Sequence, residues 1–344
     1  GKRLDASGVN VYFMGMRRGV PHPRGIWKLK QLIRKIRPDV IQTWMYHADL
    51  LGGLAARMAG KTPVIWNIRH SNLDPKDNKK TTLWTAKVCA LLSRRIPRRI
   101  VCCSEASRQI HEAIGYDQEK LLVIPNGFDL DAYRPDKEGR RMVNRLIGES
   151  VNQSVGGEMG PNTLLIGMMA RFDPQKDHRN LVQAAGLLRE WGVDCCFVLC
   201  GNGVDAKNSQ LSGWIRDAGV EDRFFLLGPR DDIPTITTGL DIACLSSVGE
   251  GFPNVLGEAM ACEVPCVATD VGDCADIVGD TGRIVPPRNP DALAGAIREL
   301  VEMGGEGRKQ LGRAARERVR ERYELGSVVK RYEGLYEDVV GLRD

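Results

Sequence analysis

Two acidic side chains lie close together in a glycine-rich stretch of the second half of the chain. Glu250 and Glu258 belong to the segment Ser246–Met260, which reads SSVGEGFPNVLGEAM. An apolar run ends at Leu245 directly before it, and a helix is predicted to begin near Asn254. Free backbone N–H groups at such a helix start suit an anion, whereas two carboxylates suit the hydroxyl groups of a sugar or a ribose. The stretch therefore predicts a site for a phosphorylated sugar or a nucleotide.

A second candidate site combines two cations across a short turn. Arg171 and Lys176 lie five residues apart in RFDPQK, which follows the predicted strand Leu164–Met169, and Pro174 fixes the turn between them. A guanidinium group binds phosphate oxygens as a planar fork, and an ammonium group binds them as a point charge. Together with the acidic stretch, these cations predict a diphosphate site.

Short apolar runs alternate with amphipathic helical segments, and the runs are typical of strands buried on both faces of a parallel sheet. The predicted strands of the first half are Val9–Met14, Val40–Trp44, Val64–Ile68, Ile100–Cys103 and Leu121–Ile124. Those of the second half are Leu164–Met169, Cys196–Leu199, Phe224–Leu227, Ile242–Leu245, Cys266–Ala268 and Arg283–Val285. Helices are predicted at Trp27–Ile36, Ala48–Met58, Leu83–Arg94, Ser104–Ile114 (with Ser104 as N-cap), Leu181–Trp191, Val255–Ala261 and Ala292–Met303. This alternation indicates two doubly wound α/β domains, which bind ligands beyond the carboxyl ends of their strands, where both candidate sites lie.

The boundary between the domains is predicted in a polar, glycine-containing segment between Pro135 and Pro161. We expect a first domain at residues 1–135, a linker at 136–160 with one weak helical run at Arg140–Ile147, and a second domain at 161–326. The charged segment Arg308–Arg322 is expected to be a helix with a mostly solvated surface. Residues 327–344 carry a last helix, Val328–Val340, whose apolar stripe must pack on another element.

These motifs and their order resemble the retaining glycosyltransferases of family 4. The resemblance rests on the two cations followed by EGFPNVLGEAMA, and it extends to PNGFD at 125–129, GNG at 201–203 and VATDVG at 267–272. It implies a GT-B fold, in which two Rossmann-like domains face a cleft, the first binding the acceptor and the second the nucleotide sugar. It also implies that the last helix crosses back to the first domain.

The resemblance also implies a role for each residue of the site. Arg171 and Lys176 would hold the donor diphosphate and stabilise the leaving nucleotide. Glu250 would bind the hydroxyls of the transferred sugar, and Glu258 would bind the ribose. Further donor contacts are implied at Gly201, Arg230, Gly251, Phe252, Asn254 and Val255.

A histidine that follows a strand of the first domain completes the family's site. His70, after Val64–Ile68, fits that position, and His47, after the preceding strand, is a rival. Asp129 and Asp131 match the metal-binding Asp-x-Asp signature of a different glycosyltransferase fold, but they belong to the PNGFD turn and are expected to be structural. Cationic side chains and a helix N-terminus can supply the charge that a metal would bring, so we expect no metal and no other cofactor.

The implied function is metal-independent, retaining hexosyl transfer from a nucleotide-diphosphate sugar, with a UDP-sugar as the expected donor, in the assembly of a cell-surface polysaccharide or glycolipid. Two departures from the family qualify it. Family members usually open with a strand and a glycine-rich loop that this sequence lacks, as expected for a truncated chain or for a variant of reduced activity. Glu263 stands where the family often has glycine. Two other functions stay open: a GT-B sugar-nucleotide epimerase, which has no acceptor, and a non-catalytic sugar-nucleotide-binding protein.

Composition and charge bear on partners and location. Hydrophobic residues make up 42% of the 344 residues, enough for two packed cores, and no apolar run approaches the roughly 18 residues of a membrane span. Residues 1–135 hold 24 Lys and Arg against 11 Asp and Glu, whereas the rest of the chain holds 25 against 33. Two solvated surfaces of different composition would explain this difference. The alternative is that the basic half attracts an anionic membrane or a phosphorylated substrate, with a lipid-linked or saccharide molecule as the expected acceptor. Few aromatic residues interleave the basic ones, which argues against nucleic acid.

The ten cysteines include no CxxC pair, and most lie in predicted strands. We therefore expect reduced, packed thiols and a cytoplasmic protein, located at the inner face of the membrane if the basic half binds lipid.

Overall fold

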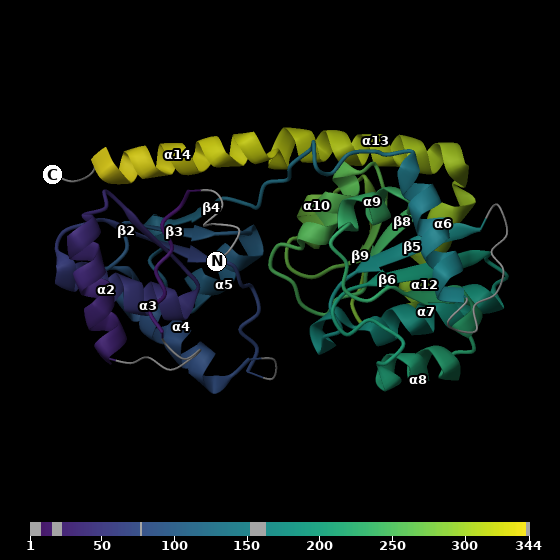
Figure 1. Cartoon of the computed structure of the whole chain (residues 1–344), viewed down its shortest axis with the longest axis horizontal. Coiled ribbons are helices and arrows are strands. Elements are labelled where there is room, and N and C mark those ends of the chain that lie inside the picture. Colours follow the sequence, from purple (N-terminus) through teal and green to yellow (C-terminus); the bar gives the residue numbers. More distant parts are fainter. Residues whose placement is uncertain (1–7, 16–22, 76–77, 152–162, 342–344) are drawn as a thin grey trace. The chain divides into compact units, whose positions relative to one another are not determined.

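The structure, a computed structural model, describes residues 8–15, 23–75, 78–151 and 163–341. It divides into two compact units (Figure 1). Unit 1 comprises Gly1–Ile124 and Arg331–Asp344, and unit 2 comprises Pro125–Lys330. Each unit is built around a parallel sheet that connecting helices cover, so the predicted fold class of two doubly wound α/β domains is confirmed.

The sheet of unit 1 has four parallel strands in chain order: β1 (Ile41–Trp44), β2 (Val64–Ile68), β3 (Arg99–Cys102) and β4 (Leu121–Val123). The helices around it are α2 (Pro23–Ile36), α3 (Tyr46–Ala59), α4 (Lys80–Ser93) and α5 (Glu105–Ala113), with a 3-10 turn, η1 (Gln118–Lys120), before β4. α2, α3 and α4 pack side by side on one face of the sheet (Figure 1). The predicted N-cap of α5 is confirmed, because the Ser104 hydroxyl accepts a hydrogen bond from the Ser107 N–H at 2.9 Å.

The predicted strand Val9–Met14 is wrong. Residues 9–14 adopt no strand conformation, and Val9, Tyr12 and Phe13 are exposed, Phe13 by 81%. A strand is defined by its hydrogen-bond ladder to a neighbour, and the described ladders of unit 1 join only β1 to β4. An apolar run indicates β-propensity, whereas pairing depends on a partner elsewhere in the chain.

The last helix, α14 (Leu325–Gly341), begins in unit 2 and ends in unit 1. Its Tyr332 hydroxyl accepts hydrogen bonds from the Asn67 side chain of β2 at 3.0 Å and from the Arg69 guanidinium at 2.6 Å. Val339 of the same helix is fully buried. The apolar stripe therefore packs on unit 1, and the predicted return of the last helix to the first domain is confirmed.

The sheet of unit 2 has six parallel strands in the order β7-β6-β5-β8-β9-β10. Their bounds are β5 (Leu164–Met169), β6 (Cys195–Cys200), β7 (Phe224–Leu226), β8 (Ile242–Leu245), β9 (Cys266–Thr269) and β10 (Gly282–Val285). The chain runs outward from β5 to β7, crosses to the other side of β5, and runs outward again from β8 to β10. The order therefore reverses between β5 and β8, which pair at Ile166 with Ile242 and at Gly167 with Ala243.

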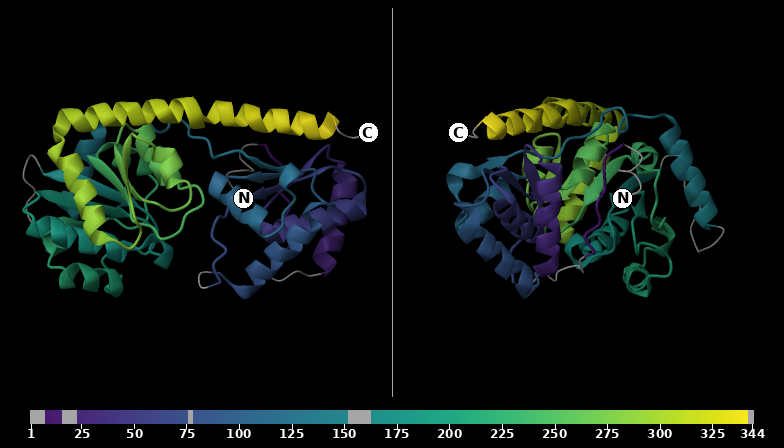
Figure 2. Two further views of the ribbon diagram at one scale, coloured as in Figure 1. Left: turned by 180° about the vertical axis from the view of Figure 1, so that it is seen from behind. Right: turned by 60° about the vertical axis from the view of Figure 1, so that its left-hand side comes forward.

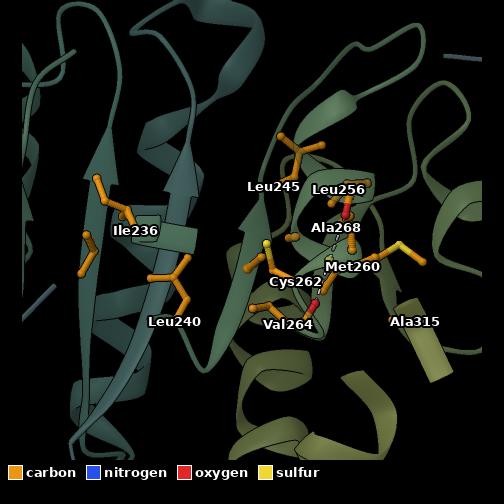
Figure 3. Close-up of a cluster of buried hydrophobic side chains, with 14 of the residues drawn as sticks. Ile236, Leu240, Leu245, Leu256, Met260, Cys262, Val264, Ala268 and Ala315 are labelled. Carbon is orange, nitrogen blue, oxygen red and sulfur yellow. Dashed lines mark hydrogen bonds between the residues drawn. The ribbon is translucent and has the colours of Figure 1, made fainter. Parts of the chain in front are cut away.

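Helices cover both faces of this sheet (Figure 2). One face packs on α7 (His178–Glu190), α8 (Ser209–Asp217) and α12 (Pro290–Glu302). The other packs on α6 (Glu138–Val151), α9 (Ile233–Thr238), α10 (Asn254–Ala261), α11 (Cys274–Val278) and α13 (Gly304–Tyr323). A 3-10 turn, η2 (Pro174–Lys176), follows β5, and another, η3 (Glu221–Arg223), directly precedes β7. Figure 3 shows part of the second layer's core, where Leu256 and Met260 of α10 lie between Leu245 and Ala268 of the sheet and Ala315 of α13.

The domain boundaries differ from the predicted ones. The structure divides the chain after Ile124 and after Lys330, not at residues 135 and 326. The segment predicted as a linker contains α6, whose Val143 is fully buried in the core of unit 2. The Arg140 guanidinium also donates to the Asp241 carboxylate at 2.6 Å. The weak helical run predicted at Arg140–Ile147 is confirmed as part of α6, but it belongs to unit 2 rather than to a linker. Residues 152–162 of the predicted linker lie outside the described residues.

Helix α13 buries more of its surface than we expected from its many charged residues. Its buried face consists of Arg308, Gly312, Ala315, Val319 and Tyr323, at helical spacing. Arg316 donates hydrogen bonds to the backbone carbonyls of Leu130 at 3.1 Å and Tyr133 at 2.9 Å. Arginine can cover apolar surface with its stem and satisfy carbonyls with its fork, which a count of charges does not reveal.

All ten cysteines lie in the described residues and are free and buried, as predicted. Among the described helices, none has the length and apolar character to cross a bilayer.

Candidate functional site

The reversal of strand order in unit 2 brings two loops together. One follows β5 and contains Lys176, and the other follows β8 and contains Glu250. The Val248 N–H donates to the Gln175 carbonyl at 2.8 Å, and the Ser246 hydroxyl lies 3.0 Å from the Lys176 carbonyl. Ligands of open α/β sheets bind at such a reversal, beyond the carboxyl ends of the strands. The two stretches that the sequence singled out therefore form one site.

At the centre of this site, a cation and a carboxylate form an ion pair. Lys176 Nζ lies 2.5 Å from Glu250 Oε1, and the Ser247 hydroxyl donates to the same oxygen at 2.6 Å. The exposed fractions of the two charged side chains are only 17% and 11%. Each group is thus held in a fixed position, at the edge of the fold where a ligand can reach it.

Arg171 lies in the same loop as Lys176 but in a different environment. Its side chain is 61% exposed, and its Nε donates to Asp173 Oδ2 at 3.1 Å. Burial raises the pKa of Asp173, but hydrogen bonds from the Gln175 N–H and the Arg171 guanidinium outweigh it and hold that pKa below its usual value. Asp173 is therefore an anion that orients Arg171 and caps the turn η2.

Two glycines allow neighbouring loops to approach the site. A Cβ on Gly201, after β6, would lie 2.1 Å from the Ala170 carbonyl oxygen of the β5 loop. A Cβ on Gly272, after β9, would lie 2.4 Å from the Glu250 carbonyl oxygen, and its φ of 57° also favours glycine. Gly201 therefore allows the loop after β6 to pack closely on the loop after β5, which is a structural reason for a glycine at this position.

Helix α10 begins beside Glu250. Its N-cap, Pro253, offers no side-chain acceptor to the first turn, so free N–H groups at this end suit a phosphate. The Asn254 side chain accepts a hydrogen bond from Asn126 at 2.6 Å. The Phe252 ring stacks on Phe128 with centroids 6.1 Å apart. The side chains of Asn254 and Phe252 are therefore engaged within the protein, and Gly251 and Val255 are half-buried. The groups that this segment offers to a ligand are mainly backbone groups.

Glu258 lies one turn further along α10. Burial raises the pKa of its carboxyl, whereas a hydrogen bond from the Tyr133 hydroxyl lowers it. Burial and the charge of Glu258 in turn raise the pKa of Tyr133. Tyr133 thus holds the carboxylate that the resemblance assigns to the ribose.

Arg230 lies in the loop after β7. Its guanidinium makes a bidentate pair with Asp232, with distances of 2.7 and 2.6 Å. The pKa of Asp232 is lowered mainly by these hydrogen bonds. Arg230 therefore has an internal partner, and it is not joined by any described hydrogen bond to Lys176 or Glu250.

In unit 1, His70 follows β2 and lies in a chain of hydrogen-bonding groups. The Tyr46 hydroxyl is 3.4 Å from His70 Nδ1 and 2.7 Å from His111 Nε2. His111 Nδ1 lies 2.6 Å from the Ser107 carbonyl oxygen. The Ser107 hydroxyl closes the loop by donating to the His70 carbonyl at 2.8 Å.

These distances assign the proton positions. A carbonyl only accepts, so His111 Nδ1 carries its proton, and burial lowers the pKa of His111 to about 4, which keeps it neutral at pH 7. Its Nε2 then accepts from the Tyr46 hydroxyl. The Tyr46 oxygen can accept from His70 Nδ1–H, which leaves His70 Nε2 as an acceptor. Burial also lowers the pKa of His70 and favours this neutral form.

The remaining sequence candidates lie elsewhere. His47, the rival histidine, is in the first turn of α3 and lines a separate pocket of unit 1. Asp129 is part of a turn, where its Oδ1 accepts from the N–H groups of Asp131 at 2.9 Å and Ala132 at 3.0 Å. Within the described residues, no cluster of three or more metal-binding side chains occurs.

Sequence reasoning missed four residues that contact the candidate side chains, two in each unit. Ser247 and Tyr133 bind the two glutamates, and Tyr46 and His111 fix His70. Ser247 stands within the glycine-rich stretch and could have been noted there. The others come from distant segments, and no spacing rule connects them.

Two family models match the chain. "Glycosyl transferases group 1" matches residues 157–318, and "Glycosyltransferase Family 4" matches residues 3–132. Each model thus falls on one half of the chain, and the first includes the β5 and β8 loops.

Curated relatives include a UDP-Gal:alpha-D-GlcNAc-diphosphoundecaprenol alpha-1,3-galactosyltransferase of Escherichia coli, 26% identical over 72% of this chain and 62% of its own length. An N-acetyl-alpha-D-glucosaminyl L-malate synthase of Bacillus anthracis is 32% identical over 51% of this chain and 45% of its own length. The chain thus spans about half of the length of these relatives.

Solved structures give the same picture of the fold. HepE of Anabaena, crystallised with UDP-glucose, has a TM-score of 0.82 at 22% identity, covering 98% of this chain and 88% of its own. A glycosyltransferase of Rickettsia africae also has a TM-score of 0.82, at 19% identity, over 98% of this chain and 87% of its own.

Proposed function

The chain belongs to the family 4, group 1 glycosyltransferases and has their GT-B fold, and from this we propose that it transfers a hexosyl unit from a nucleotide-diphosphate sugar to a hydroxyl group. We propose further that transfer retains the anomeric configuration, needs no metal, and serves the assembly of a cell-surface polysaccharide or glycolipid. The observation that carries the proposal is the pairing of Lys176 with Glu250 at the reversal point of the unit 2 sheet.

The pairing suggests how the donor is held. A donor diphosphate at the start of α10 takes the Lys176 ammonium as its counterion and releases Glu250 from the ion pair. Glu250, still held by the Ser247 hydroxyl, is then free to accept hydrogen bonds from the hydroxyls of the sugar. Arg171, with its exposed guanidinium, supplies a second cation, and Glu258 binds the ribose in place of the Tyr133 hydroxyl.

Electrostatic stabilisation of the leaving group drives the proposed reaction. The bond between the anomeric carbon and the diphosphate oxygen breaks, and the negative charge that develops on that oxygen lies beside Lys176 and Arg171. The acceptor hydroxyl attacks the anomeric carbon from the face that the diphosphate leaves, and its proton passes to the departing phosphate. Retention follows without a covalent enzyme intermediate.

His70 is the proposed contribution of unit 1. The Tyr46 and His111 chain leaves His70 Nε2 as a hydrogen-bond acceptor. We propose that it accepts from a hydroxyl of the sugar or of the acceptor and so orients the reactants. His47 is not needed for this step.

The proposed donor is a UDP-sugar and the proposed acceptor is lipid-linked. Support comes from HepE, whose crystals contain UDP-glucose, and from the Escherichia coli relative, whose name specifies UDP-Gal and a diphosphoundecaprenol-linked acceptor. A cytoplasmic protein at the inner face of the membrane meets both substrates.

The test is product analysis with the purified chain. It is incubated with UDP-glucose, UDP-galactose and UDP-N-acetylglucosamine, with and without a lipid-linked sugar, and both UDP release and the sugar products are followed. A new glycosidic bond with the donor's anomeric configuration supports the proposal. An epimerised nucleotide sugar identifies an epimerase, and nucleotide-sugar binding without any release of UDP identifies a non-catalytic binding protein.

A further inference from the structure

A pocket of about 410 Å³ opens between the first turns of two helices of unit 1. It is lined from α3 by His47, Leu50 and Leu51, and from α4 by Lys80, Thr81, Trp84 and Thr85. α3 follows β1, and α4 follows β2 after a loop. The pocket therefore lies beyond the carboxyl ends of these strands, where ligands of open parallel sheets bind.

The walls of the pocket are mostly carbon. Trp84 is 65% exposed, and Leu50 and Leu51 are half-buried. The Thr85 hydroxyl is engaged within its own helix, donating to the Thr81 carbonyl at 2.8 Å. Few polar groups remain for a sugar ring, which needs hydrogen-bond partners for its hydroxyls. The lining instead suits a hydrocarbon, whose burial removes apolar surface from water.

The rim of the pocket is positively charged. Lys80 belongs to the lining, Lys79 is exposed at the N-cap of α4, and Lys87 is exposed about two turns further along that helix. Residues 78–104 contain seven Lys and Arg and no Asp or Glu. A ligand that combines a hydrocarbon chain with a phosphate group matches both features, because the chain fills the pocket and the phosphate meets Lys80.

We propose that this pocket binds the lipid part of the acceptor: a hydrocarbon chain at the point where it joins a phosphate or diphosphate group. The proposal rests on the proposed function, in which unit 1 serves the acceptor. It narrows the acceptor class, because a purely saccharide acceptor would leave the pocket empty. His47 is then a residue of the lipid pocket, whereas His70 belongs to the reaction site.

Direct binding tests the pocket. The purified full chain is titrated calorimetrically with farnesyl diphosphate, with farnesol and with inorganic pyrophosphate. Farnesyl diphosphate is expected to bind about tenfold or more tightly than either fragment, because only the complete molecule uses both the apolar wall and the lysine. Equal binding of pyrophosphate would identify a simple anion site, and equal binding of farnesol would identify a purely apolar one; both results overturn the proposal.

Paired variants locate the binding. Thr81→Trp places a large ring in the pocket and is expected to weaken the binding of farnesyl diphosphate about tenfold or more. Leu91→Trp, on the exposed side of α4, should leave this affinity unchanged. Lys80→Gln is expected to weaken the binding of farnesyl diphosphate but not that of farnesol. Lys79→Gln, outside the lining, should have little effect on the binding of either compound. Equal behaviour within either pair, at unchanged melting temperature, contradicts the proposal.

UDP binding to the same proteins separates the two hypotheses. All four variants are expected to bind UDP as the wild type does, because the donor site lies in unit 2. Normal UDP binding and sugar transfer without farnesyl diphosphate binding would refute the lipid pocket alone. If the wild-type chain neither binds UDP nor turns over any donor, the proposed function itself is refuted.

Discussion

Lys176 and Glu250 meet across the reversal of strand order in unit 2, with Nζ and Oε1 2.5 Å apart, although 74 positions separate them in the chain. The same carboxylate oxygen accepts a hydrogen bond from Ser247. A ligand that replaces Glu250 at the ammonium group must be at least as good an anion. The proposed donor diphosphate meets this requirement, because it carries more negative charge than the Glu250 carboxylate.

Removing the cation should therefore lower the rate of donor turnover. Lys176→Ala is expected to lower kcat for donor turnover about 100- to 1000-fold, the range for loss of one preorganised charge stabiliser. The melting temperature should also fall, because the variant leaves the Glu250 carboxylate, only 11% exposed, without its cation, so kcat is measured well below that temperature. Lys207→Ala, an exposed lysine of the β6 loop region, is the matched control. Near-normal kcat in Lys176→Ala at saturating donor would show that Lys176 does not face the leaving group.

The sequence predicted the parts of this site better than their arrangement. The glycine-rich turn after β8 and the two cations after β5 are visible in the sequence because loop chemistry is local. That Lys176 pairs with Glu250 depends on β5 lying beside β8, which is a property of the strand order. Arg171 and Arg230 have internal partners in Asp173 and Asp232 that also decide how they are presented.

The fold shows the same division between local pattern and tertiary contact. The apolar runs from Val64 and from Ile242 are strands because neighbouring strands complete their ladders. Val9–Met14 has a similar pattern but no ladder in the described residues. The helical run within α6 was predicted, but the polar residues around its buried face at Val143 led to its assignment to a linker. Periodicity therefore predicted elements, and burial decided which of them form the core.

The proton arrangement around His70 leads to a second prediction. Tyr46→Phe removes the hydroxyl that links His70 to His111, so nothing holds the His70 tautomer with Nε2 free. We expect kcat to fall about tenfold, less than the roughly 100- to 10,000-fold contribution of a general acid or base, because only the orientation of His70 changes, while KM for the donor stays unchanged. Tyr116→Phe is the matched control, because the Tyr116 ring packs on His111 with centroids 5.1 Å apart without joining this chain. If the two variants lower kcat equally, Tyr46 contributes only by packing and not by its hydrogen bond to His70.

The pH dependence of turnover should reflect the same neutral imidazole. Burial lowers the pKa of His70, so the neutral form persists as the pH falls past the ordinary value of about 6.5. The acid limb of the kcat profile is therefore expected below that pH. A limb at or above it would indicate that His70 is more hydrated than in this structure, or that another group controls turnover.

Metal removal provides a third test. Lys176, Arg171 and the start of α10 are proposed to neutralise the diphosphate, so saturating EDTA should leave the rate of transfer unchanged. Asp129 is engaged as the acceptor of a turn, and Asp131→Asn should likewise have no effect on turnover. Loss of activity in EDTA, with recovery on adding manganese or magnesium, would contradict the charge argument and make the Asp129 turn a candidate metal site.

Glu263 offers a test of backbone strain. It has a φ of 62°, in the left-handed region where a side chain costs about 1 kcal/mol or more, and it stands on the turn between α10 and β9. Glu263→Gly removes that strain from the folded state, but it also makes the unfolded chain more flexible, which opposes part of the gain in stability. We expect the free energy of unfolding to rise by about 0.5 kcal/mol, read as a small rise in melting temperature. Glu302→Gly, at the last residue of α12, should instead lower the free energy of unfolding slightly, because a helical position favours glutamate over glycine. A fall in both variants would mean that Glu263 makes contacts worth more than its strain.

The basic surface of unit 1 leads to the last prediction, which concerns location. Arg94, Arg95 and Arg98 are exposed after the end of α4, and Leu91 on the last turns of that helix is 79% exposed. Each basic residue near an anionic bilayer contributes about 1 kcal/mol, an attraction that salt screens.

The purified chain is therefore expected to pellet with vesicles containing phosphatidylglycerol at low salt, and not with phosphatidylcholine vesicles or at high salt. Changing the three arginines to glutamine should weaken the binding by about 100-fold, since three such contributions are lost. The matched control changes Arg141, Arg145 and Lys207 of unit 2, which removes the same charge from exposed positions and should leave pelleting unaltered. If both triple variants lose binding equally, net charge rather than this surface is responsible. If the wild type pellets with neither kind of vesicle, the acceptor must reach the enzyme without the help of the membrane surface.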